Sequence, residues 1–307
     1  MRRIARALLF TCLCATAQAQ PFAGIASVVG ETDADGFSAI RLRAGALFDY
    51  QSAWRYFGVA AQENLYSQSG WHENAHAVLG FWRDQNRDTL SGVNVEAGVI
   101  QVGGHTRPIG DMTWNLQPTT DTTFEFLGAA GLVETQPAIE QGIGYTFWGV
   151  AAEQKLTDRV TAVALAGYQP YTDGNARTHF RARLIWDALP EEGVNLQARW
   201  RSYRDSETDV GGAYFNPETY NQWMGVVGFR KKLAGWTTTG AVGAGQEHIQ
   251  NSGTTTQPTY LAEVRAEGPV AGDARLALQA AYNRSAGFSN SPDYWWGIVS
   301  VVLIVPF

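Results

Sequence analysis

Apolar and polar side chains alternate along most of the chain beyond residue 22. In the clearest segment Phe180, Leu184 and Trp186 alternate with Arg181 and Arg183. Successive side chains of a β-strand point to opposite faces, so each such segment has one apolar and one polar face. A helix would scatter these arginines around its circumference. The pattern therefore predicts strands that gather their polar side chains on one surface.

About sixteen segments of this kind follow one another, separated by clusters of Gly, Asn, Asp, Pro and Ser. Uniformly short linkers alternate with more variable ones. The longest of the second group are 131–142, 169–176, 205–218, 247–257 and 285–293. Short periplasmic turns that alternate with longer external loops are typical of outer-membrane β-barrels. An even number of strands and periplasmic placement of both termini follow from this arrangement.

The last strand ends the chain on an aromatic residue. Val299, Val301, Leu303, Val305 and Phe307 lie on one face of the segment 294–307. A buried strand of a soluble sheet could be equally apolar, but a terminal Phe without a polar tail resembles the C-terminal signature of bacterial outer-membrane barrels. We therefore expect this strand to close the barrel at Phe307 and to be read by the barrel-assembly machinery.

The first nineteen residues have the form of an export signal. Arg2, Arg3 and Arg6 precede a short apolar run, and residues 17–19 read Ala-Gln-Ala, a typical cleavage site. Both cysteines lie in this segment, and a lipid anchor at Cys12 is the alternative interpretation. We expect residues 1–19 to be removed, and residues 20–307 to form a single domain in the outer membrane.

Composition supports this class of protein. The chain is 12% aromatic and only 17% charged, with 11 Trp and 33 Gly, and no later segment resembles a membrane helix. Only closure of the sheet pairs every backbone group in lipid, so the sequence predicts an all-β, antiparallel up-and-down transmembrane barrel of about 16 strands. Without the signal's three arginines, 20 Lys and Arg oppose 29 Asp and Glu, a net charge of −9. This excess argues against a nucleic-acid partner.

The polar faces supply the candidate ligand path. We expect the following residues to line the lumen: Arg177, Arg181, Arg183, Arg199, Arg201, Glu96, Asp111, Glu125, Glu263 and Glu267. Arginines opposite carboxylates offer donors and acceptors to sugar hydroxyls, and guanidinium groups bind carboxylates in a fork. The alternative is that these residues form mutual ion pairs that plug and stiffen the interior.

Aromatic residues divide into two groups. Most tryptophans fit interface girdles, namely Trp71, Trp114, Trp148, Trp186, Trp200, Trp236, Trp295 and Trp296. Four aromatic residues are predicted to lie on lumen faces or in a long loop, where they could contact sugar: Trp82, Tyr203, Tyr214 and Phe215.

Several short motifs occur in an order known from one family. They are Pro108-Ile109-Gly110, Glu134-Thr135, Asp173-Gly174-Asn175-Ala176-Arg177, Tyr214-Phe215-Asn216-Pro217 and Arg230-Lys231-Lys232. The region 107–232 thereby resembles the C-terminal barrel of the outer-membrane exporters of poly-N-acetylglucosamine and cellulose. In that family an array of periplasmic helical repeats precedes the barrel, whereas here the barrel begins almost at the cleavage site. The resemblance therefore implies the pore, with a separate periplasmic scaffold protein as a possible partner.

We expect a passive channel for exopolysaccharide, in contact with membrane lipid and the polymer chain, and without cofactor or metal. The predicted gates are the loops 205–218 and 247–257, and the loop and gate residues are Asp173, Asn175, Tyr203, Tyr214, Phe215 and Pro217. The alternatives are a general small-solute porin and a structural or adhesion barrel with a plugged lumen. The net acidic charge would suit a cationic polymer, but the mixed charges of the lumen argue against that inference.

Catalytic chemistry has weak support. His72 and His76 share a strand face but would lie about 13 Å apart, which is too far for one metal ion. The Gly-x-Ser-x-Gly turn of serine hydrolases does not occur. We expect no enzyme, and a site assembled from distant strands stays open as an alternative.

Overall fold

A computed structural model describes residues 22–207, 209–285 and 294–307, so the predicted signal and most of the predicted loop 285–293 lie outside the described residues. Sixteen strands and one short helix make up these residues. The strands are β1 (Ala23–Asp33), β2 (Ser38–Ser52), β3 (Arg55–Gln68), β4 (Trp71–Gln85), β5 (Gly92–Val102), β6 (His105–Thr119), β7 (Thr122–Leu132), β8 (Gly144–Thr157), β9 (Val160–Pro170), β10 (Ala176–Leu189), β11 (Val194–Asp205), β12 (Thr219–Leu233), β13 (Trp236–Gln250), β14 (Thr254–Pro269), β15 (Arg275–Arg284) and β16 (Trp295–Pro306), and the helix α1 (Gln136–Glu140) follows β7.

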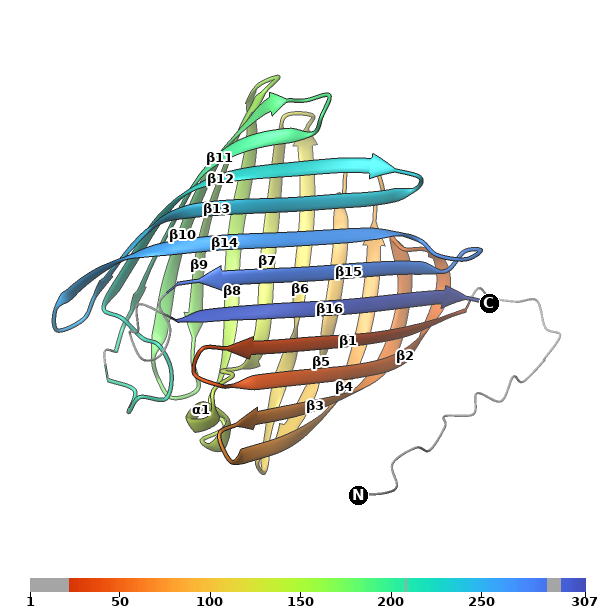
Figure 1. Ribbon diagram of the computed structural model, residues 1–307. Helices are drawn as coiled ribbons and strands as arrows, with labels where there is room; N and C mark the ends of the chain where they lie inside the picture. The colour runs from red at the N-terminus through yellow and green to blue at the C-terminus, as the bar shows by residue number, and fades with distance from the viewer. Residues whose placement is uncertain (1–21, 208, 286–293) are drawn as a thin grey trace.

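The sheet is closed. Each strand pairs antiparallel with its neighbours in the chain, and β1 pairs with β16 in a register that runs from Ala23 opposite Pro306 to Asp33 opposite Trp296 (Figure 1). The amide of Phe307 donates to the carbonyl of Phe22 at 2.9 Å and extends this seam by one bond. The predicted up-and-down barrel is therefore confirmed.

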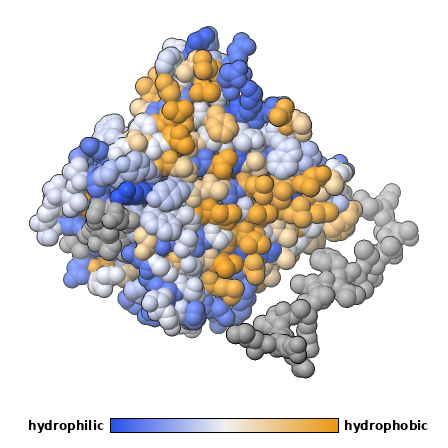
Figure 2. Space-filling model, viewed as in Figure 1, coloured by the Kyte–Doolittle hydropathy of each residue, from blue (hydrophilic) through white to orange (hydrophobic). Residues whose placement is uncertain are grey.

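The two faces of the sheet differ as the alternation predicts. On β16 the outward side chains of Val299 and Phe307 are 59% and 78% exposed. Apolar side chains gather in a broad patch over β14 to β16 and β1 (Figure 2). An apolar outer surface on a closed barrel is the architecture of outer-membrane proteins, and the outer-membrane location follows from this fold. No helix among the described residues is long and apolar enough to span a bilayer.

The two ends of the barrel differ in their connections. The described chain begins and ends at one end, where adjacent strands are joined by turns as short as Ala234-Gly235, in which both residues have positive φ. Such a turn matches the twist of a hairpin. The opposite end carries residues 133–143 with α1, and residues 206–218. Figure 1 shows α1 at the end of the barrel away from the C-terminus.

Three predicted features are wrong. Residues 247–257 form no long loop, because β13 continues to Gln250 and β14 begins at Thr254. Threonines favour an extended backbone, and those of 254–256 pair with 248–250. Trp82 lies opposite Phe57 on the outward face, 53% exposed, and so cannot contact a solute in the lumen. Trp71 instead packs inside the barrel beside Phe37, away from any girdle.

Candidate functional site in the lumen

Two loops fold into the barrel at the end opposite the termini. We call them the inward loops: residues 133–143 between β7 and β8, and the described residues of 206–218, all but 208, between β11 and β12. Thr135 Oγ1 of the first loop donates to the carbonyl of Ala213 in the second at 2.6 Å. Buried apolar side chains from both loops and from the β9–β10 turn pack together, namely Ala138, Ile143, Tyr171, Ala213 and Tyr214. The two loops are therefore one packed unit.

Local sequence explains the helix in the first inward loop. Thr135 is the N-cap, and its hydroxyl accepts from the amide of Ala138 at 3.2 Å. Pro137 fits the first turn, where no amide donor is needed, and Gly142 follows the C-cap with φ +63°. A Cβ at residue 142 would approach the His105 ring to 2.4 Å, so only glycine fits. The predicted linker 131–142 thus contains a helix, which its capping residues could have indicated.

An ion-pair cluster anchors the first inward loop to the wall. Arg41 of β2 binds Glu31 of β1 at 2.9 Å and also contacts Glu134 of the loop. Burial raises the pKa of the Glu134 carboxyl, and Arg41 opposes this rise. Arg107 donates through Nε to the carbonyl of Gly142 at 2.7 Å. Both ends of the loop are thus held by arginines of the barrel wall.

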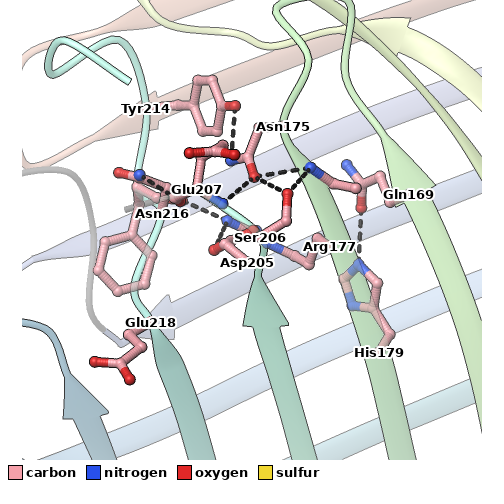
Figure 3. A network of polar contacts seen from close by, with 12 residues as sticks. Gln169, Asn175, Arg177, His179, Asp205, Ser206, Glu207, Tyr214, Asn216 and Glu218 are labelled. Carbon is pink, nitrogen blue, oxygen red and sulfur yellow. Dashed lines mark hydrogen bonds and ion pairs between the residues drawn. The ribbon is translucent and has the colours of Figure 1, made fainter. Parts of the chain in front are cut away.

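Asn175 joins the β9–β10 turn to the second inward loop, as Figure 3 shows. Its side chain is 2% exposed, and its Oδ1 accepts from Ser206 Oγ at 3.1 Å and from the amide of Glu207 at 3.0 Å. Its Nδ2 donates to the Tyr214 hydroxyl at 3.0 Å, and that hydroxyl donates to Asp173 at 2.8 Å. Burial raises the pKa of Tyr214 above its ordinary value, so the phenol stays protonated and can donate.

Arg177 holds the other side of the second inward loop. Its guanidinium binds Asp205 through two bonds of 2.7 and 3.0 Å and donates to the carbonyl of Phe215. The same guanidinium lies 4.4 Å from the ring centroid of Tyr203, which stacks on Tyr220 at 4.5 Å. Tyr203 therefore belongs to the inner wall on β11, whereas Tyr214, Phe215 and the buried Pro217 belong to the loop.

The interior contains cavities at three levels. One of about 580 Å³ adjoins the inward loops and is lined by Glu96, Asp111 and Arg177, among others. A second of about 370 Å³ is lined by Glu125, Arg181, Arg183, Arg199 and Arg201. A third of about 530 Å³, at the end with the termini, includes Glu267. Glu263 meets Arg199 at 3.4 Å. All ten predicted lumen residues thus lie on the inner face, at different levels and not at one site.

Further interior residues were absent from the predicted set. Arg43 binds Glu96 through bonds of 2.5 and 2.8 Å and Gln62 at 2.9 Å. Glu247 is fully buried and accepts from Tyr220, Ser285 and Gln257 at 2.6, 2.5 and 2.7 Å. The alternation that identified the other arginines also puts Arg41 and Arg43 on a polar face, so these two could have been found. Glu247 could not have been found in this way, because it was assigned to a loop.

The described His, Asp and Glu residues were also compared with the requirements of a metal site. Within the described ranges no group of three or more His, Cys, Asp or Glu is close enough to hold a metal ion. His76 points outward and contacts Glu63 of the neighbouring strand at 2.5 Å. The chemistry available inside the barrel is hydrogen bonding, ion pairing and aromatic contact.

Comparison with known proteins adds information on the fold. No family model and no curated protein sequence matches the chain. Among solved structures, a bacterial polysaccharide outer membrane secretin superposes with a TM-score of 0.64 at 12% identity, over 94% of this chain and 100% of the other. CdiB from Acinetobacter baumannii superposes with a TM-score of 0.50 at 7% identity, over 94% of this chain and 60% of the other. At these identities the similarity shows a shared outer-membrane barrel fold.

Proposed function

We propose that the barrel is a passive channel that carries a polysaccharide chain across the outer membrane. One observation carries the proposal: the motif residues that resemble the exporter family meet at the inward loops. Glu134, the pair Asn175 and Arg177, and Tyr214 come from three separate parts of the sequence, yet all anchor the same packed unit beside the luminal cavity of about 580 Å³. The full-length similarity in fold to the polysaccharide secretin supports this function.

The mechanism is the exchange of weak contacts. Arginines, carboxylates and amides of the inner face would replace water around sugar hydroxyls, and Tyr203 and Phe215 would contact sugar rings. Many weak sites allow a chain to move, whereas one tight site would arrest it. The inward loops would have to move aside as the chain passes. No bond is broken in this mechanism, and no cofactor takes part.

Three partners belong to the proposal. Lipid would surround the apolar belt, the barrel-assembly machinery would bind the C-terminal strand, and a separate periplasmic scaffold protein would deliver the polymer. The end that carries the termini would face the periplasm.

Conductance in planar bilayers tests the function. We expect ion-conducting channels that soluble oligosaccharides block briefly and reversibly. Steady openings that no oligosaccharide blocks would instead identify a general small-solute porin. A complete lack of conductance, in protein that is folded by electrophoretic criteria, would identify a plugged structural barrel.

A further inference from the structure

Four arginines form a compact group on two neighbouring strands. Arg181 and Arg183 of β10 lie directly opposite Arg201 and Arg199 of β11 in the ladder. We call these four residues the arginine quartet. Like charges directly opposite each other on adjacent strands are destabilising. All four side chains line the cavity of about 370 Å³. A repulsive arrangement around an internal cavity suggests a ligand of opposite charge.

Half of the quartet has no hydrogen-bond or ion-pair partner among the described residues. Arg199 donates to Gln197 at 2.8 Å and meets Glu263 at 3.4 Å, and Arg201 donates to Tyr220 at 2.7 Å and Ser285 at 3.0 Å. The Nε of Arg201 is buried without an acceptor in the described structure. Arg181 and Arg183 make no hydrogen bond or ion pair with any described residue. Their donors are available to a solute.

Other luminal arginines behave differently. Arg43 reaches from β2 to Glu96 on β5, three strands away, and binds it through two bonds. Glu125 on β7 is also three strands away from β10, and it lines the same cavity as the quartet. However, no arginine of the described chain forms an ion pair with Glu125. Two of the quartet's guanidinium groups are therefore not used to brace the barrel.

The ligand that fits is a sugar with a carboxylate. A guanidinium binds a carboxylate through two parallel bonds, and such charge-assisted bonds are stronger than neutral ones. Glu125, Glu153 and Glu263 stand near the quartet and could accept from sugar hydroxyls. We propose that the arginine quartet is a binding site for acidic sugar residues, and that the transported polymer is polyanionic.

This inference rests on the proposed function and specifies its substrate class. It differs from what the resemblance implies, because poly-N-acetylglucosamine and cellulose carry no carboxylates. The arginine quartet would be one of several weak binding sites along the lumen. Each acidic sugar would bind there transiently and then be replaced by the next sugar of the chain.

Blockade of single channels by charged oligosaccharides tests the inference. The probes are an oligogalacturonate, a cationic chitosan oligomer and a neutral cello-oligosaccharide of equal length. We expect oligogalacturonate to block the unmodified channel at the lowest concentration. In the R181Q/R183Q variant the half-blocking concentration of oligogalacturonate should rise by about tenfold, which corresponds to the loss of about one charge-assisted contact. The values for the other two probes should change little.

Arg265→Gln is the matched control, because Arg265 lines another level of the lumen and is paired with Glu267 at 3.1 Å. It should change ion selectivity without changing the oligogalacturonate blockade. If R265Q raises the half-blocking concentration of oligogalacturonate as much as R181Q/R183Q does, the cause is the overall charge of the lumen, and the proposed binding site is wrong. Blockade by cationic or neutral oligomers but not by oligogalacturonate would overturn the inference and leave the channel function intact. If no oligosaccharide blocks the channel, the proposed function itself fails.

Discussion

The Glu63 and His76 pair is the most unexpected feature among single residues. Both side chains point outward from neighbouring strands, and Glu63 lies between Ala61 and Leu65 on the outer face of β3. Ionisable groups on a lipid-facing surface lower stability by an amount that depends on depth. We therefore do not expect the Glu63 and His76 pair to stabilise the barrel.

Replacement of both residues by leucine should leave the barrel at least as stable as the unmodified protein. We expect a gain of up to about 1 kcal/mol in the free energy of unfolding, since the pair lies toward one edge of the apolar belt. Reversible urea unfolding in lipid vesicles measures this quantity. A clear loss of stability would contradict this expectation and show that the Glu63 and His76 pair stabilises the barrel.

Glu134 should make the inward loops sensitive to pH. Although Arg41 attracts the ionised carboxyl, the cost of burying the charge is larger, so the docked position raises the pKa of Glu134 above the ordinary value. The docked loop therefore binds a proton more readily than a loop released into solvent. Docking is therefore favoured as the pH falls through the raised pKa towards the ordinary value of 4.5, and is less favoured above it. We expect conductance to fall on mild acidification.

The comparison of two variants isolates this effect. Glu134→Gln should remove the part of the pH dependence that comes from the loop and keep conductance low at neutral pH. Glu140→Gln alters an exposed carboxyl in the same inward loop and should behave like the unmodified channel. Identical pH profiles for all three proteins would contradict this role of Glu134.

At the scale of residues, alternation predicted which side chains face the lumen but not which partners they have. Arg181 and Arg199 lie on the predicted face because the strand period is two. The pairing of Arg43 with Glu96 depends on how strongly the sheet curves, since their strands are three apart. The hydrogen bonds of Asn175 to Glu207 and Tyr214 depend on loop packing, for which no period exists.

At the scale of elements, the second inward loop and the β13–β14 hairpin should have different effects on conductance. Residues 206–218 are anchored inside the lumen by Asn175 and Arg177, whereas residues 251–253 are a tight turn. Replacement of residues 209–216 by a short Gly and Asn linker should increase single-channel conductance, because it removes Tyr214 and Phe215 from the cavity lining. Planar bilayer recording measures the change.

The matched control replaces Ser252-Gly253 by Asn-Gly, which preserves the ladder and keeps Asn251, whose Oδ1 accepts from the amide of Glu218 at 3.2 Å. Conductance should not change, because this hairpin does not line the luminal cavities described above. An increase of similar size in both variants would mean that the second inward loop does not narrow the lumen.

Strand positions could be predicted well, and the errors have clear causes. Each strand buries one face and exposes the other, so its pattern survives in the sequence. The helix α1 has only five residues, which are too few for the apolar spacing of a helix to repeat and be recognised. The β13–β14 hairpin extends beyond the apolar belt, where its outward and inward residues are both polar, so the alternation disappears although the pairing continues.

At the scale of the whole molecule, substitution of Phe307 can distinguish an effect on assembly of the barrel from an effect on its stability. Its ring is 78% exposed on the outer face, while its amide makes the last bond of the β1–β16 seam. Phe307→Ala keeps that amide, so the unfolding free energy in vesicles should change by no more than about 0.5 kcal/mol. The amount of barrel in the outer membrane of cells should fall if the assembly machinery reads this ring. Equal amounts of both proteins in the membrane would contradict the signal role.

The closed seam also limits how a solute can pass. Separation of any two strands would expose two rows of amide and carbonyl groups to hydrocarbon, and each unsatisfied group costs several kcal/mol. The wall therefore keeps one circumference whether it is empty or filled. A bulky molecule cannot enter by widening the barrel, so it has to shed its hydration shell at the mouth and recover equivalent hydrogen bonds from the side chains inside.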